Sequence, residues 1–158
     1  MLKTESAAIN KLFHYTSCGL KNVWLRNGFD ERDTSYGKGI AIQDVEGLHR
    51  AIGLYLVQNK PRLSGAEVRF LRKELDMPQS QLGMLLGVSE NTLRGWENNR
   101  TRITKPAERM LRVLYYEYAR GASLVIRDLI LRISQLNREI HIKKMEFEKT
   151  EETWSAAA

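Results

Sequence analysis

The segment of this sequence that most restricts its fold runs from residue 78 to residue 98 and reads PQSQLGMLLGVSENTLRGWEN. Pro78 is typical of the first turn of a helix, and Ser89 is typical of the residue that caps the start of the next one. Between them, Gly87 permits the left-handed backbone with which many helices end. The segment therefore predicts two short helices that are joined by a tight turn and cross at a steep angle.

Small and apolar residues in this segment predict how the two helices pack. The first helix is expected to run to Leu86 and the second from Glu90 to Asn98. Gly83 lets the first helix come close to its neighbour. Glu97 is predicted to stabilise the end of the second helix by hydrogen bonding to the loop that follows it. The core beneath the two helices is expected to contain Leu82, Leu85, Leu86, Val88, Leu93 and Trp96.

Polar residues occupy the outward positions in the first turns of the second helix. Asparagine can bond adenine through two hydrogen bonds, arginine can bond guanine, glutamate can accept from the amino group of cytosine, and the threonine methyl can contact thymine. A helix that enters the major groove of DNA contacts base edges with these first turns. The predicted base-reading residues are Glu90, Asn91, Thr92 and Arg94.

A second group of residues is predicted to hold the DNA backbone. Residues 60–112 contain eleven Lys and Arg against six Asp and Glu, so most of the net charge of +6 lies in the middle of the chain. Phosphates attract cations and hydrogen-bond donors whatever the base sequence. Such donors lie at the start of the first helix and in the loop after the second. The predicted backbone contacts are Gln79, Asn98, Asn99, Arg100 and Arg102.

The same segment resembles the helix-turn-helix family of the Cro and lambda-repressor type, also called the XRE family, over about residues 64–116. The matching positions are Gln79, Leu82, Leu86-Gly87-Val88-Ser89, Thr92, Trp96-Glu97 and Asn98. Three positions depart from the family pattern: Pro78 replaces a serine, Gly83 an alanine and Asn99 a glycine. Asparagine tolerates the left-handed conformation, so Asn99 still permits the helix to end there. The resemblance implies a five-helix-type DNA-binding domain.

The order of elements further upstream is similar to that of MqsA-type antitoxins, which place a zinc-binding domain before a domain of this kind. Cys18 is the only cysteine, so the paired Cys-x-x-Cys motifs of that family's zinc site are missing. His14, Cys18 and His49 are also too few for a structural zinc site, which normally has four protein ligands. This resemblance therefore implies the order of domains and a twofold dimer, but no metal and no other cofactor.

Helix signals also flank the central segment on both sides. Asp44 is expected to cap a helix that ends near Asn59. Ser64 and Glu67 have the spacing of a capping box, which predicts a helix directly before the central segment. Another helix is expected to begin after Thr104, with a proline in its first turn.

The two ends of the chain follow other patterns. Alternating apolar and polar residues between residues 13 and 42 predict two or three short strands. A short strand is also expected near Phe147, and the closing residues 156–158 are excluded from the fold as a tail. Beyond Gly121, apolar residues recur at steps of four and three, which is typical of a coiled-coil seam that either joins two subunits or covers the core of one. The seam consists of Ala122, Ile126, Leu129, Ile133, Leu136 and Ile140.

Together these patterns predict a mainly α protein with a small β-containing N-terminal domain. The expected domains are residues 1–60 (N-terminal, α and β), 61–120 (helix-turn-helix) and 121–155 (a C-terminal helix and short strand for dimerisation). The sequence contains no apolar stretch of the roughly 18 residues that span a membrane, and it begins without a signal-peptide pattern. With a single cysteine and no disulfide, a cytoplasmic location is expected.

The predicted function is sequence-specific regulation of transcription by a homodimer that binds an inverted repeat in double-stranded DNA and represses by occupying it. The alternative is an antitoxin that binds a toxin through its N-terminal strands and also regulates its own promoter. No residue arrangement typical of an enzyme is found. Binding of a small molecule stays open, because Tyr15, Trp24 and Tyr36 fit either a pocket or ordinary core packing.

Overall fold

The computed structural model describes residues 12–121, 124–136 and 144–157 of the chain. In this part of the chain, six helices are accompanied by three antiparallel sheets of two strands each. The helices are α1 (Val45–Asn59), α2 (Gly65–Glu74), α3 (Gln79–Leu86), α4 (Glu90–Glu97), α5 (Lys105–Ala119) and α6 (Val125–Ser134). The strands are β1 (Phe13–His14), β2 (Trp24–Leu25), β3 (Phe29–Thr34), β4 (Gly37–Ile42), β5 (Phe147–Lys149) and β6 (Trp154–Ala156).

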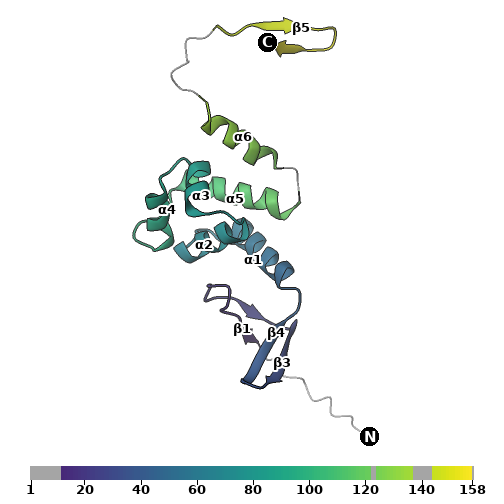
Figure 1. Cartoon of the computed structure of the whole chain (residues 1–158), viewed down its shortest axis with the longest axis vertical. Coiled ribbons are helices and arrows are strands. Elements are labelled where there is room, and N and C mark those ends of the chain that lie inside the picture. Colours follow the sequence, from purple (N-terminus) through teal and green to yellow (C-terminus); the bar gives the residue numbers. More distant parts are fainter. Residues whose placement is uncertain (1–11, 122–123, 137–143, 158) are drawn as a thin grey trace.

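The predicted fold class, mainly α with a small β-containing N-terminal part, is confirmed. Helices α1 to α5 gather in the middle of the molecule, the β3–β4 hairpin projects at one end, and the β5–β6 hairpin lies at the other (Figure 1). Of the helices that the structure describes, none combines the length and the apolar character that crossing a membrane requires.

Helices α1 to α5 begin where the sequence signals predict. Ser64 and Glu67 form a reciprocal capping box at the start of α2, because each side chain accepts a hydrogen bond from the other's backbone N–H, both at 3.3 Å. The hydroxyl of Ser89 accepts from the N–H of Thr92 at 3.1 Å and starts α4. Gly87 ends α3 with φ 72°, so the predicted left-handed turn residue is confirmed.

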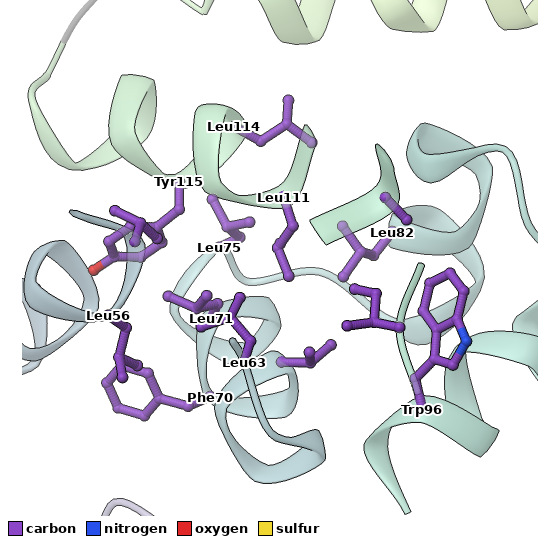
Figure 2. Packing of buried hydrophobic residues seen from close by; sticks show 14 of the residues in the cluster. Leu56, Leu63, Phe70, Leu71, Leu75, Leu82, Trp96, Leu111, Leu114 and Tyr115 are labelled. Carbon is purple, nitrogen blue, oxygen red and sulfur yellow. The ribbon is translucent and has the colours of Figure 1, made fainter. Parts of the chain in front are cut away.

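The core lies among α1 to α5. Figure 2 shows Leu71 of α2, Leu82 of α3 and Leu111 of α5 pointing toward a shared centre, and all three are fully buried. Tyr115 of α5 lies over Gly53 of α1, where any Cβ atom would collide with the tyrosine ring. Burial raises the pKa of Tyr115 to about 12. Helix α1 therefore shares its core with the helices that follow it.

Four strands in the described N-terminal part form two hairpins, β1 with β2 and β3 with β4, which is more than the two or three strands that the sequence predicts. A chain of hydrogen bonds joins this part to the helices. The hydroxyl of Tyr15 and the Nε2 atom of His49 are 2.8 Å apart, and the Nδ1 atom of His49 lies 2.9 Å from a carboxylate oxygen of Glu74. A neutral His49 satisfies both bonds when Nδ1 donates to Glu74 and Nε2 accepts from Tyr15.

The C-terminal part corrects two predictions. The coiled-coil seam was expected to continue past Leu136, but α6 ends at Ser134, after which the N–H groups of Gln135 and Leu136 donate to carbonyls three residues back, both at 3.2 Å. Of the predicted seam, Ala122 and Ile140 lie outside the described residues. The tail was also wrongly excluded, because Ala156 pairs with Phe147 in the β5–β6 hairpin.

Helix α6 has two apolar faces with different surroundings. Its inner face, with Ile126, Ile130 and Leu131, packs against the core, and the helix contacts α3 and α5. Its outer face is about half exposed and carries Val125, Leu129 and Ile133, followed by Leu136 just past the helix. Within this chain, the helix thus covers its own core and leaves a second apolar row uncovered.

Candidate nucleic-acid interface

The crossing of α3 and α4 depends on close backbone approach. A Cβ atom at Gly83 would lie 2.9 Å from the carbonyl oxygen of Val88, which is tighter than real side chains allow. Beneath the crossing, Leu82, Leu93 and Trp96 are buried, as the sequence predicts. These contacts fix the angle between the two helices and leave the opposite face of α4 without a role in the core.

A buried ionic cluster holds the end of α4 against α2 and α3. Glu97 is 2% exposed, and its Oε1 atom accepts a hydrogen bond from the Nε atom of Arg72 at 2.6 Å. Its Oε2 atom accepts from the side-chain amide of Gln79. Arg72 also donates to the carbonyl of Met77, in the turn between α2 and α3, at 3.0 Å. We call Arg72, Gln79 and Glu97 the buried cluster.

The buried cluster corrects one prediction about Glu97. Its role in holding the helix end was expected, but its partners were expected in the loop after α4. They lie instead 25 and 18 residues earlier in the chain. A carboxylate buried this deeply needs a charged partner, and Arg72 is the nearby cation that α2 directs toward it.

The predicted base-reading residues share the exposed face of α4. Glu90, Asn91, Thr92 and Arg94 are all exposed. Two of them pair with one another, since the Nη2 atom of Arg94 lies 3.2 Å from the Oε1 atom of Glu90. The hydroxyl of Thr92 lies 2.9 Å from that of Ser89. The structure therefore places the four residues together on one helical surface.

The predicted backbone-contacting residues fall into two sets. Gln79, Asn98 and Asn99 have side chains engaged inside the protein: Gln79 donates to Glu97, Asn98 accepts from Arg69 at 2.9 Å, and Asn99 accepts from the N–H of Gly65 at 3.0 Å. Asn99 has φ 56°, the left-handed conformation expected at this position. The second set, Arg100 and Arg102, is exposed.

The structure adds a cation that sequence reasoning missed. Arg62, just before α2, lines a cavity of about 380 Å³ together with Arg100 and Arg102, and no acidic residue lines it. None of the three arginines forms an ion pair with another described residue. We call these three residues the open arginine group. No local pattern signals Arg62, because only the fold brings it to the loop 38 residues later.

Two short crossing helices, a buried core beneath them and an exposed polar face on the second define a helix-turn-helix domain. Residues 68–107 match the family model described as helix-turn-helix, and the domain is of the Cro and lambda-repressor type. Domains of this family bind DNA, and their proteins are typically regulators without enzymatic activity. No curated protein and no solved structure matches the chain.

The residues that we considered as metal ligands have other contacts. The ring of His14 stacks on that of Trp24, with 4.1 Å between centroids, and its Nε2 atom lies 2.5 Å from the carbonyl oxygen of Lys21. His49 lies between Tyr15 and Glu74. Among the residues that the structure describes, no three His, Cys, Asp or Glu side chains gather as a metal site would require.

Proposed function

We propose that this protein is a sequence-specific transcriptional repressor that inserts α4 into the major groove of DNA. The observation that carries the proposal is the placement of two groups, one on α4 and one around the loop that follows it. The four polar residues of α4 have no role in the core, and the open arginine group lies around the loop that follows the same helix. Base-edge contacts and phosphate contacts are needed together for specific binding.

Within this proposal, Asn91 and Arg94 make the principal base contacts, assisted by Glu90 and Thr92. Arg94 must first leave Glu90, an exchange that costs little because exposed pairs contribute at most about 1 kcal/mol. Arg62, Arg100 and Arg102 neutralise phosphates, and the rest of the backbone set (Gln79, Asn98 and Asn99) lies at the edges of the contact.

The proposed assembly is a homodimer that forms through the outer face of α6. Support comes from the exposed apolar residues Val125, Leu129 and Ile133 on one side of α6, with Leu136 just past the end of the helix. A single domain reads few base pairs, so two half-sites one helical turn apart, about 34 Å, supply the required specificity. We place this assembly in the cytoplasm, where its DNA is accessible.

The proposal is tested by selecting bound sequences from a random pool of DNA duplexes at about 150 mM salt, which suppresses nonspecific electrostatic binding. We expect enrichment of an inverted repeat, followed by reduced transcription in vitro from a promoter that contains it. Failure to enrich any sequence, with binding that only fades as salt rises, contradicts base reading. If an inverted repeat is enriched but the protein stimulates transcription, base reading is supported and the repressor role is contradicted.

A second candidate function is neutralisation of a toxin, and the β3–β4 hairpin favours it. The hairpin projects from the helices (Figure 1), and Tyr36 at its tip is fully exposed. A two-stranded sheet has two unpaired edges, to which another chain can add a strand. The test is growth of cells that express a neighbouring reading frame with this protein or with its Tyr36→Ala variant. Rescue by the first and not by the second supports the antitoxin function, and no toxicity at all contradicts it.

A further inference from the structure

A cavity of about 660 Å³ lies between the N-terminal strands and the helices. One wall comes from β2 and the loop before it, the other from α1 and the start of α2, and Asn99 lines part of one side. Leu20 and Leu56, both 6% exposed, also line it and extend the apolar core to its surface. Its volume is in the range of about 300 to 1,000 Å³ that is usual for small-molecule sites.

The lining of this cavity combines apolar area with a few polar groups. Trp24 and Tyr55 are 54% and 63% exposed, so much of their ring surface is available to a ligand. Of the charged residues in the lining, Lys60 and Glu67 pair with each other at 3.2 Å. Lys21 forms no ion pair with another described residue, which leaves one cation for a ligand.

We propose that this cavity binds a small organic carboxylate with a flat or aliphatic apolar body, and that its occupation weakens DNA binding. The apolar body would lie against Trp24 and Tyr55, and the carboxylate would pair with Lys21. This arrangement matches an apolar pocket in which few polar groups fix the orientation of the ligand. The regulatory half of the inference rests on the proposed function, whereas the binding half does not.

The path from the cavity to the DNA surface is short. Asn99 lines both this cavity and the cavity of the open arginine group. Its side chain accepts the hydrogen bond from Gly65 that joins the loop after α4 to the start of α2. Because Asn99 borders the cavity, a ligand that fills it and displaces this hydrogen bond shifts the loop that carries Arg100 and Arg102. Coupling of this kind is reciprocal between the two ligands.

Binding is tested by calorimetric titration of the full chain, without DNA, with indole-3-acetate, salicylate and octanoate. We expect at least one to bind with a dissociation constant of about 1 mM or tighter, as ligands of this size do. The neutral amide of that compound should bind at least fivefold more weakly. Lys21→Gln should have the same effect as the amide, whereas Lys38→Gln, an exposed lysine of β4 outside the cavity, should change nothing.

A cavity-filling variant provides the decisive control. Ala51 is exposed on α1 and lines the cavity, so Ala51→Trp fills the space without disturbing the core. We expect an unchanged circular dichroism spectrum and at least tenfold weaker binding. If none of the three carboxylates binds at 10 mM, or if Ala51→Trp leaves binding unchanged, the site is refuted. If the molecular mass of Ala51→Trp in sedimentation differs from that of the wild type, the cavity belongs to a contact between two copies of the chain. That result would also refute the small-molecule site.

Regulation is tested on the DNA that the selection experiment yields. We expect a saturating concentration of the bound carboxylate to weaken DNA affinity at least threefold in the wild type and less than 1.5-fold in Ala51→Trp. If a carboxylate binds in the calorimeter but does not change the affinity for DNA, the proposed regulation is refuted and the proposed binding site stands. Absence of any DNA binding would overturn the proposed function together with the regulatory half, again without affecting the calorimetric result.

Discussion

The buried cluster and the open arginine group use the same residue type in opposite ways. In the buried cluster, Arg72 is directed inward, and its partner Glu97 is almost completely covered. In the open arginine group, three guanidinium groups surround a cavity that no acidic residue lines. The first arrangement fixes the positions of helices, whereas the second leaves charge available to another molecule. Position in the fold, not residue type, decides which arginine holds helices together and which remains accessible.

The largest predicted effect is on stability and comes from removing Arg72 from the buried cluster. Arg72→Ala leaves the Glu97 carboxylate buried without its cation, and we expect a loss of about 3 to 5 kcal/mol in the free energy of unfolding. The measurement is urea denaturation followed by circular dichroism. Arg94→Ala is the matched control, because its partner Glu90 is exposed, and we expect it to cost at most about 1 kcal/mol. Equal losses for both variants would contradict the distinction.

A second prediction concerns the close approach that holds the ends of α2 and α4 together. A Cβ atom at Gly65 would collide with the carbonyl oxygen of Trp96 and lie 2.6 Å from that of Glu97. We expect Gly65→Ala to destabilise the fold by about 3 kcal/mol, since backbone atoms cannot move aside easily.

Gly95 is the control for this substitution, because a Cβ atom there would meet only Thr101 at 3.5 Å. We expect Gly95→Ala to be neutral or to stabilise α4 by up to about 1 kcal/mol, as alanine favours helices. Thermal unfolding of both variants checks the pair of expectations, and a large loss in the control would mean that α4 tolerates no added side chain.

The third prediction separates base contacts by α4 from phosphate contacts by the open arginine group. Asn91→Ala should weaken binding to the selected DNA by about 1 to 3 kcal/mol and relax the preference at one base pair. The fold should be unaffected, because Asn91 is exposed. Fluorescence anisotropy with selected and scrambled duplexes provides the measurement. Equal losses on the two duplexes would remove Asn91 from the base-reading residues.

The smallest expected effect concerns the open arginine group. Arg62→Gln and Arg100→Gln should each leave unfolding within about 0.5 kcal/mol of the wild type. Each should weaken binding to all DNA sequences alike and reduce the slope of log affinity against log salt by about one. Arg120→Gln, at the end of α5 and outside this group, is the control and should not change the slope. If Arg62→Gln also leaves the slope unchanged, Arg62 does not contact phosphate.

Sequence reasoning succeeded where the signal is local. Capping residues, Gly87 and Pro106 fix helix ends through contacts within a few positions, so their patterns are visible along the chain. It failed where distant segments meet. The partners of Glu97 and the position of Arg62 depend on how α2 packs against α4, which no spacing records. The predicted seam also overran α6, because the apolar spacing continues past Ser134, where the helix ends.

The two apolar faces of α6 have a consequence for the distance between the two DNA half-sites that a dimer would contact. The inner face of α6 lies on α3, and α3 is joined to α4 by the turn at Gly87. A partner on its outer face would therefore lie only about 10 Å, one helix diameter, from that pair of helices. Two subunits joined in this way would hold their α4 helices at a fixed separation. The distance between the half-sites would then be set by helix packing instead of by a flexible linker.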